Sequence, residues 1–320
     1  MQKGRIINLN GGIYKVLLED NSIISVRARG KLRQEKKMMA NPKSESKKEV
    51  LTIVKNTPKV GDIAFIENGF IDHTDTRFNE MVRPDIANVD QILLVFAAVE
   101  PNFSYYLLDL FLVNILKQKI KPVIVVSKID KLDDASLFEL KENLSYYTNL
   151  GYPVYFVDSK HQVGMAPILD ELRGKITVLS GQTGAGKSTL INALVPGFKL
   201  QTQEISYALG RGKHTTRETN LYPFLNGFIG DTPGFSKLDL LGIEKEDLSE
   251  LFVEFKNYRC KFRDCNHLEN SKGCAILEAK DKGEILSSRY ESYNKMYKEV
   301  SRWRFHCQSW LQILLIWKAH

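Results

Sequence analysis

The chain has 320 residues, enough for two or three domains. With 43% hydrophobic and 26% charged residues, its composition excludes wholesale disorder and collagen-like structure, and four cysteines are too few for a disulfide scaffold. The N-terminus lacks the apolar segment of a signal peptide, and the apolar run at residues 310–317 is shorter than the roughly 20 residues that span a bilayer. We therefore expect a soluble cytoplasmic protein.

The net charge of +7 is concentrated at the two ends of the chain. Residues 1–75 carry 14 Lys/Arg against 9 Asp/Glu, and residues 251–320 carry 13 against 8. The middle of the chain has a net charge of −3. This distribution favours a chemical core between two segments that bind a polyanion. The alternative is that the lysines only solvate the surface.

The N-terminal residues have the pattern of a small all-β barrel. Apolar runs at residues 4–7, 13–18, 22–28 and 62–67 are separated by turn residues at a spacing typical of such barrels. Between them, residues 31–49 carry seven Lys/Arg and three Glu. We predict a mobile basic loop there, or a disordered insertion without a partner.

The texture of the chain changes at Val89. Near-continuous apolar runs at residues 92–96 and 122–126 predict buried parallel strands. Further strands are expected at residues 152–157 and 176–179, and helices near 104–118 and 134–150. This alternation predicts a doubly wound α/β sheet, and Asn226-Gly227 predicts a tight hairpin within it. Beyond residue 240 the chain reads as helical around a Cys/His cluster.

A phosphate-binding loop is predicted between a strand at residues 175–179 and a helix at residues 188–194. The sequence there fits G-x-x-x-x-G-K-[ST], whose backbone N–H groups and helix N-terminus bind phosphate. Lys187 is expected to reach the β and γ phosphates and Ser188 to bind Mg²⁺. The predicted nucleotide-binding residues here are Gly181, Gln182, Thr183, Gly184, Ala185, Gly186, Lys187, Ser188 and Thr189.

Two further segments downstream complete the predicted catalytic set. Asp231-Thr-Pro-Gly234 fits D-x-x-G, in which the Asp holds Mg²⁺ through water and the Gly N–H senses the γ-phosphate. Between this motif and the P-loop, residues 210–217 are polar and contain glycine. Thr215 or Thr216 could complete the Mg²⁺ shell there. The alternative is an ordinary surface loop.

The base-recognition motif is predicted upstream of the P-loop, in an unusual place. Residues 127–130 fit three of the four positions of N-K-x-D, directly after a predicted strand. Asp130 can accept hydrogen bonds from the guanine N1–H and N2–H₂ groups, which adenine lacks. The Lys128 stem can cover the base, and Ser159 and Lys160 lie where a loop touching guanine O6 belongs. A plain turn at the end of the strand is the alternative.

Three cysteines and one histidine fall within 15 residues near the C-terminus: Cys260, Cys265, His267 and Cys274. Soft sulfur and nitrogen ligands at this spacing predict a tetrahedral Zn²⁺ site, and four protein ligands make it structural. The alternative is a set of unrelated free thiols. Cys307 is left without a role.

The order of motifs is a circular permutation, and the chain resembles the circularly permuted, small-ribosomal-subunit-dependent GTPases of the RsgA or YjeQ family over about residues 1–300. Residues 77–84 and 87–91 carry this resemblance together with the motifs above. It implies an α/β fold class with an N-terminal all-β OB-fold barrel, a central circularly permuted P-loop GTPase domain and a C-terminal helical zinc-binding domain. We place these at residues 1–72, 85–240 and 241–300, with a linker at 73–84 and an atypical tail at 301–320.

The resemblance also implies a function. It predicts Mg²⁺-dependent GTP hydrolysis that the small ribosomal subunit stimulates, by a monomer that binds 16S rRNA through its barrel and zinc domain during late 30S assembly. GTP would favour a subunit-bound state, and hydrolysis would release it. Two rival readings are a P-loop ATPase or small-molecule kinase, and a non-catalytic RNA chaperone with a vestigial nucleotide fold.

Ser127 and residues 301–320 depart from the family's pattern, and Phe235 departs from the pattern of many other GTPases. Ser127 stands where the family usually has Asn, so we expect weaker guanine affinity with specificity retained through Asp130. Phe235 follows Gly234 where many GTPases place a water-orienting Gln, which predicts slow intrinsic hydrolysis. His214 is a candidate for positioning the water, with a structural loop histidine as the alternative. Residues 301–320 do not align with the family, and we expect an altered or poorly ordered tail rather than an added amphipathic helix.

Overall fold

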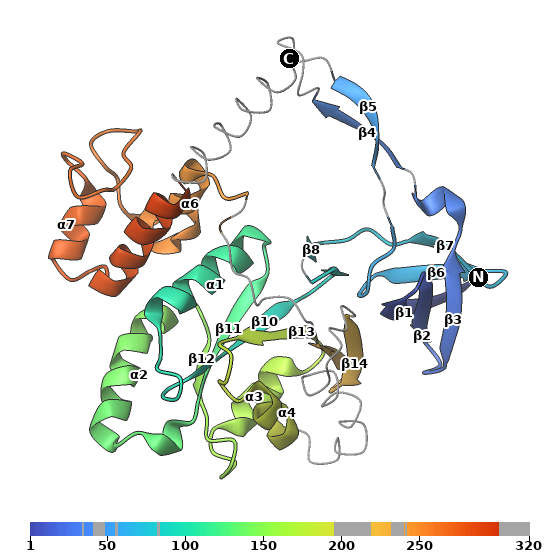
Figure 1. The fold of residues 1–320 in the computed structure, drawn as a ribbon, viewed down its shortest axis with the longest axis horizontal. Helices are drawn as coiled ribbons and strands as arrows, with labels where there is room; N and C mark the ends of the chain where they lie inside the picture. The colour runs from blue at the N-terminus through green and yellow to red at the C-terminus, as the bar shows by residue number, and fades with distance from the viewer. Residues whose placement is uncertain are drawn as a thin grey trace, which may run out of the picture. The chain divides into compact units, whose positions relative to one another are not determined.

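The chain forms two compact units in a computed structural model (Figure 1). The first takes its described residues from Met1–Asp90, Glu171–Leu179 and Lys199–Phe235. The second takes them from Gln91–Asp170, Ser180–Phe198 and Ser236–His320. The structure describes residues 1–33, 35–40, 49–54, 57–81, 84–194, 219–231, 240 and 242–300.

A five-stranded barrel dominates the first unit. It consists of β1 (Gln2–Asn10), β2 (Ile13–Leu18), β3 (Ile23–Ala28), β6 (Ile63–Glu67) and β7 (Phe70–Thr74). The strands follow the order β1-β2-β3-β7-β6, and β6 pairs with β1 to close the barrel. Alternate residues point inward, as the alternating burial along β2 shows. The predicted OB-like barrel is confirmed.

One part of the N-terminal prediction is wrong. Strands β4 (Glu35–Ala40) and β5 (Glu49–Val54) form an antiparallel hairpin, whereas the sequence predicted a loop over residues 31–49. The charges of β4 masked its strand character. Its partner β5 is rich in β-branched residues, which favour the extended backbone that a ladder requires. A short 3₁₀ turn, η1 (Gly30–Arg33), precedes β4.

The first unit also holds a three-stranded piece of α/β sheet. Strands β14 (Asn220–Phe224) and β15 (Gly227–Asp231) form a hairpin, and β15 runs parallel to β13 (Ile176–Gly181). The hairpin is confirmed, but its turn residues are Leu225 and Asn226, one position earlier than predicted. Gly227 is instead the first strand residue, where a Cβ would lie 2.3 Å from the Lys175 carbonyl oxygen.

The segment after the barrel adds two short strands to the first unit. These are β8 (Glu80–Met81) and β9 (Ile86–Ala87), which pair with each other in antiparallel fashion.

The second unit contains a parallel sheet and its helices. The strand order is β12-β11-β10, with β10 at Gln91–Ala97, β11 at Lys121–Ser127 and β12 at Val154–Phe156. Every residue of β10 is buried, as its apolar sequence predicts. Helix α1 (Tyr105–Lys117) packs against β11, and α2 (Asp134–Asn149) packs against β12. Shorter helices are α3 (Met165–Leu172) and α4 (Lys187–Leu194).

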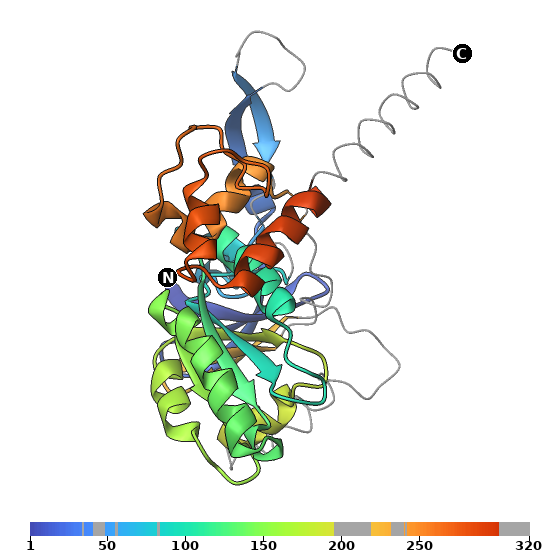
Figure 2. The same ribbon diagram turned by 90° about the vertical axis from the view of Figure 1, so that its left-hand side faces the viewer.

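C-terminal helices complete the second unit (Figure 2). They are α6 (Lys245–Leu251), the 3₁₀ turn η4 (Val253–Asn257), α7 (Ala275–Asp281) and a helical segment at residues 287–300. These helices share one apolar core with Leu110 and Val113 of α1. Its largest members are Phe252, Phe255, Tyr290, Tyr293, Met296 and Tyr297.

A buried ion-pair cluster lies beside this core. Arg289 is fully buried, and its guanidinium donates to Asp109 on α1 (2.6 Å) and to Glu254 in η4 (2.8 Å). The hydroxyl of Tyr147 on α2 also donates to Asp109 (2.8 Å). Burial raises the pKa of Asp109, and Arg289 opposes that shift. The cluster therefore joins α1, α2, η4 and the last helical segment.

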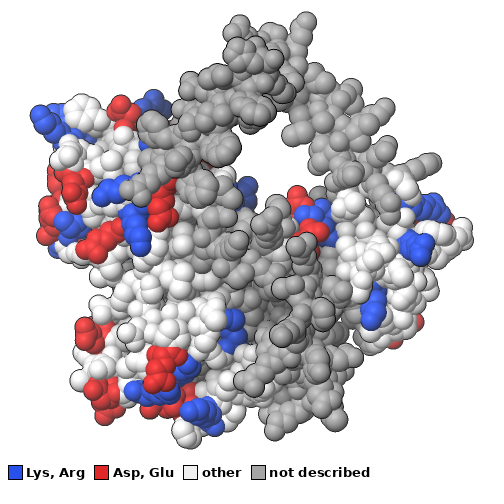
Figure 3. Space-filling model, in the orientation of Figure 1, with Lys and Arg blue, Asp and Glu red and all other residues white. Residues whose placement is uncertain are grey.

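The surface of the C-terminal helices carries both signs of charge, interspersed on the face that Figure 3 shows. Residues 251–300 hold 10 Lys/Arg and 8 Asp/Glu, so most of the positive excess predicted for this end belongs to residues 301–320, outside the described residues. Among the helices in the described ranges, none has both the length and the apolar character needed to cross a membrane.

Candidate functional site

The P-loop forms a tight turn between β13 and α4. Gly181 has φ of +123°, and a Cβ on it would lie 2.1 Å from the carbonyl oxygen of Val95, so only glycine fits. Gly184 and Gly186 also have positive φ, at 80° and 81°. Helix α4 begins at Lys187, so its N-terminus follows the loop directly, which is the context that the motif requires for binding an anion.

Lys187 lies within this loop. Its ammonium group donates to the carbonyl oxygens of Gly181 (3.2 Å) and Gln182 (2.8 Å). Burial lowers the pKa of Lys187, because the charged form loses hydration. A phosphate group beside it would oppose that shift. Ser188 and Thr189 follow with exposed side chains in the first turn of α4.

A cavity of about 150 Å³ adjoins the P-loop. The carboxylate of Asp130 borders it with its side chain 19% exposed, 3.9 Å from the ammonium group of Lys160. An acceptor at a small cavity beside a phosphate-binding loop suits a base that carries N–H donors. The lining brings together the two segments predicted for the base site and the P-loop: Ser127, Lys128, Asp130, Lys131, Asp158, Ser159, Lys160, Ala185, Gly186 and Thr189.

Ser127 joins the end of β11 to the P-loop. Its hydroxyl oxygen lies 2.6 Å from the carbonyl oxygen of Ala185 and 3.1 Å from that of Phe96. The side chain is buried, so this hydroxyl contributes a hydrogen bond that water does not replace. The short serine therefore reaches the P-loop without the amide group that the family pattern leads one to expect.

Lys128 adopts the left-handed backbone conformation, with φ of 59° and ψ of 36°. Its ammonium group donates to the carbonyl oxygen of Glu100. Its Cε atom lies 3.9 Å from the point where a Cβ on Gly186 would stand. The aliphatic stem thus runs beside the P-loop, where it can cover a flat ring.

Asp158, which no sequence motif singled out, organises the loop that follows β12. Its Oδ1 atom accepts from the backbone N–H groups of Lys160 (2.9 Å) and His161 (3.3 Å). Burial favours a raised pKa, but hydrogen bonds from the His161 ring and from these N–H groups hold the pKa of Asp158 below its usual value. An Asp that precedes Ser-Lys-His is a signal for such a turn.

The loop after β10 supports the P-loop and was also missed. The Gln182 side chain donates to the carbonyl oxygen of Asn102 (3.0 Å), and its backbone N–H donates to that of Val95 (3.0 Å). Pro101 lies 3.5 Å from the position of a Cβ on Gly184. The two segments are 80 residues apart in sequence, so no local pattern connects them.

The Cys/His cluster is brought together as predicted, and its four ligand atoms lie within 4.8 Å of one another. The sulfurs of Cys260 and Cys274 are 3.8 Å apart, and the His267 Nδ1 atom lies 3.5 Å and 3.6 Å from them. A tetrahedral zinc with ordinary bond lengths requires edges of about 3.8 Å between two sulfurs and about 3.6 Å between sulfur and nitrogen. The donor set therefore fits Zn²⁺.

The protonation of these ligands also depends on their burial. Burial lowers the pKa of His267, which favours the neutral imidazole that binds metals. Burial raises the pKa of the Cys274 thiol to about 12, and a bound cation offsets this by stabilising the thiolate.

Of the remaining predicted site residues, the structure describes only the backbone of Asp231. Asp231 is the last residue of β15, which pairs in parallel with the strand that leads into the P-loop. Four predicted catalytic residues lie outside the described residues: His214, Thr215, Thr216 and Gly234. Phe235 and the tail at 301–320 also lie outside them. Their roles stay predictions.

The family model described as "RsgA GTPase" matches residues 74–241, more than half of the chain. This chain belongs to the RsgA GTPase family. Its membership makes it a GTPase and accounts for the permuted order of base motif, P-loop and D-x-x-G. The resemblance stated from sequence motifs is thereby confirmed.

Curated relatives and solved structures agree with the RsgA assignment. Proteins named "Small ribosomal subunit biogenesis GTPase RsgA" are 41% identical in Onion yellows phytoplasma (strain OY-M), over 94% of this chain and 98% of the relative, and 42% identical in Bacillus velezensis, with the same coverage. YjeQ from Thermotoga maritima has a TM-score of 0.76 at 32% identity, covering 93% of this chain and 98% of its own. YloQ, titled a circularly permuted GTPase, gives 0.74 at 34%, covering 94% and 96%.

Proposed function

We propose that this RsgA-family GTPase acts in the biogenesis of the small ribosomal subunit, as a checkpoint in late 30S assembly that binds 16S rRNA. The carrying observation is the single cavity where Ser127–Asp130, the Asp158–Lys160 turn and the P-loop meet, in a chain whose relatives bear the name of a small-subunit biogenesis GTPase. We propose that the protein acts in the cytoplasm as a monomer.

The proposed roles follow from the chemistry of the site. Asp130 accepts from the guanine N1–H and N2–H₂ groups, Lys128 covers the ring, and Ser159 and Lys160 border O6. The P-loop N–H groups and Lys187 hold the phosphates. Ser188, Asp231 and Thr215 or Thr216 hold Mg²⁺, which neutralises charge on the phosphates when it is bound. Gly234 senses the γ-phosphate, and His214 is proposed to help position the attacking water.

The Cys260, Cys265, His267 and Cys274 cluster is proposed to hold one structural Zn²⁺. Its four protein ligands leave no open position, so its contribution is to the folding of the residues around it rather than to hydrolysis. The division into a barrel at residues 1–72, a GTPase domain at 85–240 and a zinc-binding domain at 241–300 is part of the same proposal.

Co-sedimentation with purified small ribosomal subunits tests the checkpoint role. We expect the chain to pellet with subunits in the presence of a non-hydrolysable GTP analogue and to remain in the supernatant with GDP. A Lys187→Ala variant, which cannot hold the γ-phosphate, should lose the difference between the two nucleotides. Equal pelleting of the unaltered protein with both nucleotides would contradict the proposed release on hydrolysis.

A further inference from the structure

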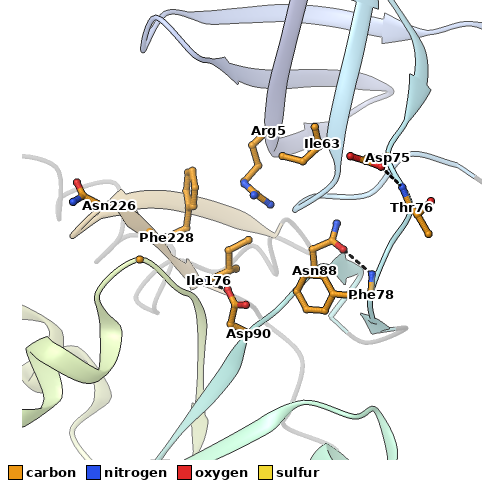
Figure 4. A pocket seen from close by; sticks show the side chains of 12 residues that line it. Arg5, Ile63, Asp75, Thr76, Phe78, Asn88, Asp90, Ile176, Asn226 and Phe228 are labelled. Atoms are coloured by element: carbon orange, nitrogen blue, oxygen red, sulfur yellow. Dashed lines mark hydrogen bonds between the residues drawn. The ribbon is translucent and has the colours of Figure 1, made fainter.

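A cavity of about 320 Å³ within the first unit has no part in nucleotide hydrolysis as described above (Figure 4). It lies between β1 of the barrel, the segment after β7, and strands β13 and β15. Its volume is at the lower end of the range for small-molecule sites, which suits a ligand the size of one nucleobase. Its lining is Arg5, Ile63, Asp75, Thr76, Phe78, Asn88, Asp90, Gly174, Ile176, Asn226, Gly227 and Phe228.

Flat surfaces border the cavity. The guanidinium of Arg5 points into it, with Cζ 5.5 Å from the ring centroid of Phe228, and Nη1 is fixed by a hydrogen bond to the Gly61 carbonyl oxygen (2.7 Å). Phe78, whose side chain is 63% exposed, also lines the cavity. Guanidinium planes and exposed aromatic rings are the surfaces on which unpaired bases stack.

The backbone that carries Phe78 is held in place. Its N–H group donates to Oδ1 of the buried Asn88 (3.1 Å), whose amide donates to the Gly61 carbonyl oxygen (3.2 Å). The neighbouring Asn79 exchanges two hydrogen bonds with Val89, at 2.7 Å and 2.9 Å. An exposed phenylalanine on a rigid segment loses little freedom when a ligand stacks on it. This segment belongs to the residues 77–84 that the GTPase motifs did not explain.

Two carboxylates complete the site. Oδ1 of Asp75 accepts from the Thr76 N–H (2.8 Å), and Oδ2 of Asp90 accepts from the Ile176 N–H (2.7 Å). Both residues are exposed, and each carboxylate can accept further hydrogen bonds. The cavity therefore offers acceptors at Asp75 and Asp90 and donors at Arg5.

We propose that this cavity binds one unpaired base of an RNA that carries an exocyclic amine: adenine, cytosine or guanine. The two carboxylates disfavour a phosphate group, whereas a neutral base carries no charge that they repel. The exocyclic amine of such a base donates to Asp75 or Asp90, a ring acceptor faces Arg5, and Phe78 stacks on the ring. The choice of RNA rests on the proposed function.

Binding of fluorescein-labelled oligoribonucleotides by fluorescence anisotropy tests the proposal. The full chain, saturated with GDP to fill the P-loop site, is titrated with rA, rC and rU oligomers of equal length. Uracil has no exocyclic amine, so we expect rA and rC to bind at least about fivefold more tightly than rU, as one good base contact provides. Equal affinity for all three, or no binding of any, would overturn the proposal.

Variants locate the preference. Phe78→Ala and Asp75→Asn change exposed side chains and should reduce the preference for rA and rC to less than about twofold, while GDP affinity stays unchanged. Phe138→Ala, which removes a 67% exposed ring from α2 in the other unit, is the matched control and should retain the preference. A preference that survives in the Phe78 and Asp75 variants would place base recognition elsewhere. None of these outcomes depends on subunit-stimulated hydrolysis, so the proposed function stands or falls separately.

Discussion

At the scale of single residues, Ser127 is the most informative departure from the family pattern. A serine lacks the amide of asparagine, yet its hydroxyl reaches the Ala185 carbonyl oxygen at 2.6 Å, so the contact with the P-loop persists. The expected loss concerns the base itself, since the single hydroxyl proton is used on a carbonyl oxygen and serine has no amide N–H to offer guanine. Asp130 lies 3.9 Å from the Lys160 ammonium group and is the residue that we propose discriminates against adenine.

Ser127→Ala should weaken the binding of GDP by roughly two- to tenfold, because one buried hydrogen bond contributes about 0.5–1.5 kcal/mol. Titration of a fluorescent GDP analogue measures the effect. Ser145→Ala, at an exposed position on α2, is the control and should bind as the unaltered chain does. Undiminished affinity in Ser127→Ala would show that the hydroxyl does not support the loop.

The Asp158 carboxylate gives the base loop a pH dependence with a definite sign. Its pKa in the folded chain is lower than the usual value of about 3.9, so its contribution to stability is complete above that value and is lost as the pH falls through the lower, folded value. We expect the stability difference between the unaltered chain and Asp158→Asn to shrink as the pH falls below about 4. Urea unfolding at a series of pH values measures it, and a difference that is constant or grows on acidification would refute the assignment.

At the scale of elements, two local centres lie among the C-terminal helices: the Cys/His cluster and the buried Arg289. The spacing of Cys260, Cys265, His267 and Cys274 predicted the first, because ligands close in sequence must meet when one ion binds them. No pattern predicted the second, because Asp109, Glu254 and Arg289 come from distant parts of the chain and meet only in the folded unit. The pairing of β4 with β5 was missed for a different reason, because the many charged residues of residues 31–49 are typical of a loop.

Removal of zinc should unfold the C-terminal helices. We expect one zinc per chain by elemental analysis, and loss of helical circular dichroism together with a lower melting temperature after chelation. Cys260→Ser should lose the metal, whereas Cys307→Ser, which changes the cysteine without an assigned role, should keep it. Full helicity after complete removal of the metal would contradict a structural site.

Arg289→Ala should destabilise the second unit strongly. The change leaves the Asp109 and Glu254 carboxylates buried without their cation, which costs about 3–5 kcal/mol. Arg259→Ala, at an exposed arginine of the same region, should change stability by less than about 0.5 kcal/mol. Urea unfolding provides the comparison, and a loss of less than about 1 kcal/mol in Arg289→Ala would show that the cluster contributes little.

At the scale of the whole molecule, the permuted order of motifs could be recognised from the sequence, because each motif still has the flanking strand or helix that it has in other GTPases. Strand β13 leads into the P-loop and α4, and β11 leads into Ser127–Asp130, so the nucleotide site could be assigned from short segments. The contacts that hold this site in place could not be predicted. The hydrogen bond from Gln182 to Asn102 joins distant segments, and the turn at Asp158 depends on the geometry of its loop. The cavity beside the P-loop shows that these segments, which the sequence only orders along the chain, lie together in space.

The rate of GTP turnover, with and without purified small ribosomal subunits and with ATP as the control nucleotide, tests the central claim most directly. If the small subunit activates this GTPase, GTP alone is turned over slowly, the rate increases many-fold when subunits are added, and ATP is not turned over in either case. GTP turnover that is unaffected by subunits would keep the nucleotide site but contradict the small subunit as the activator.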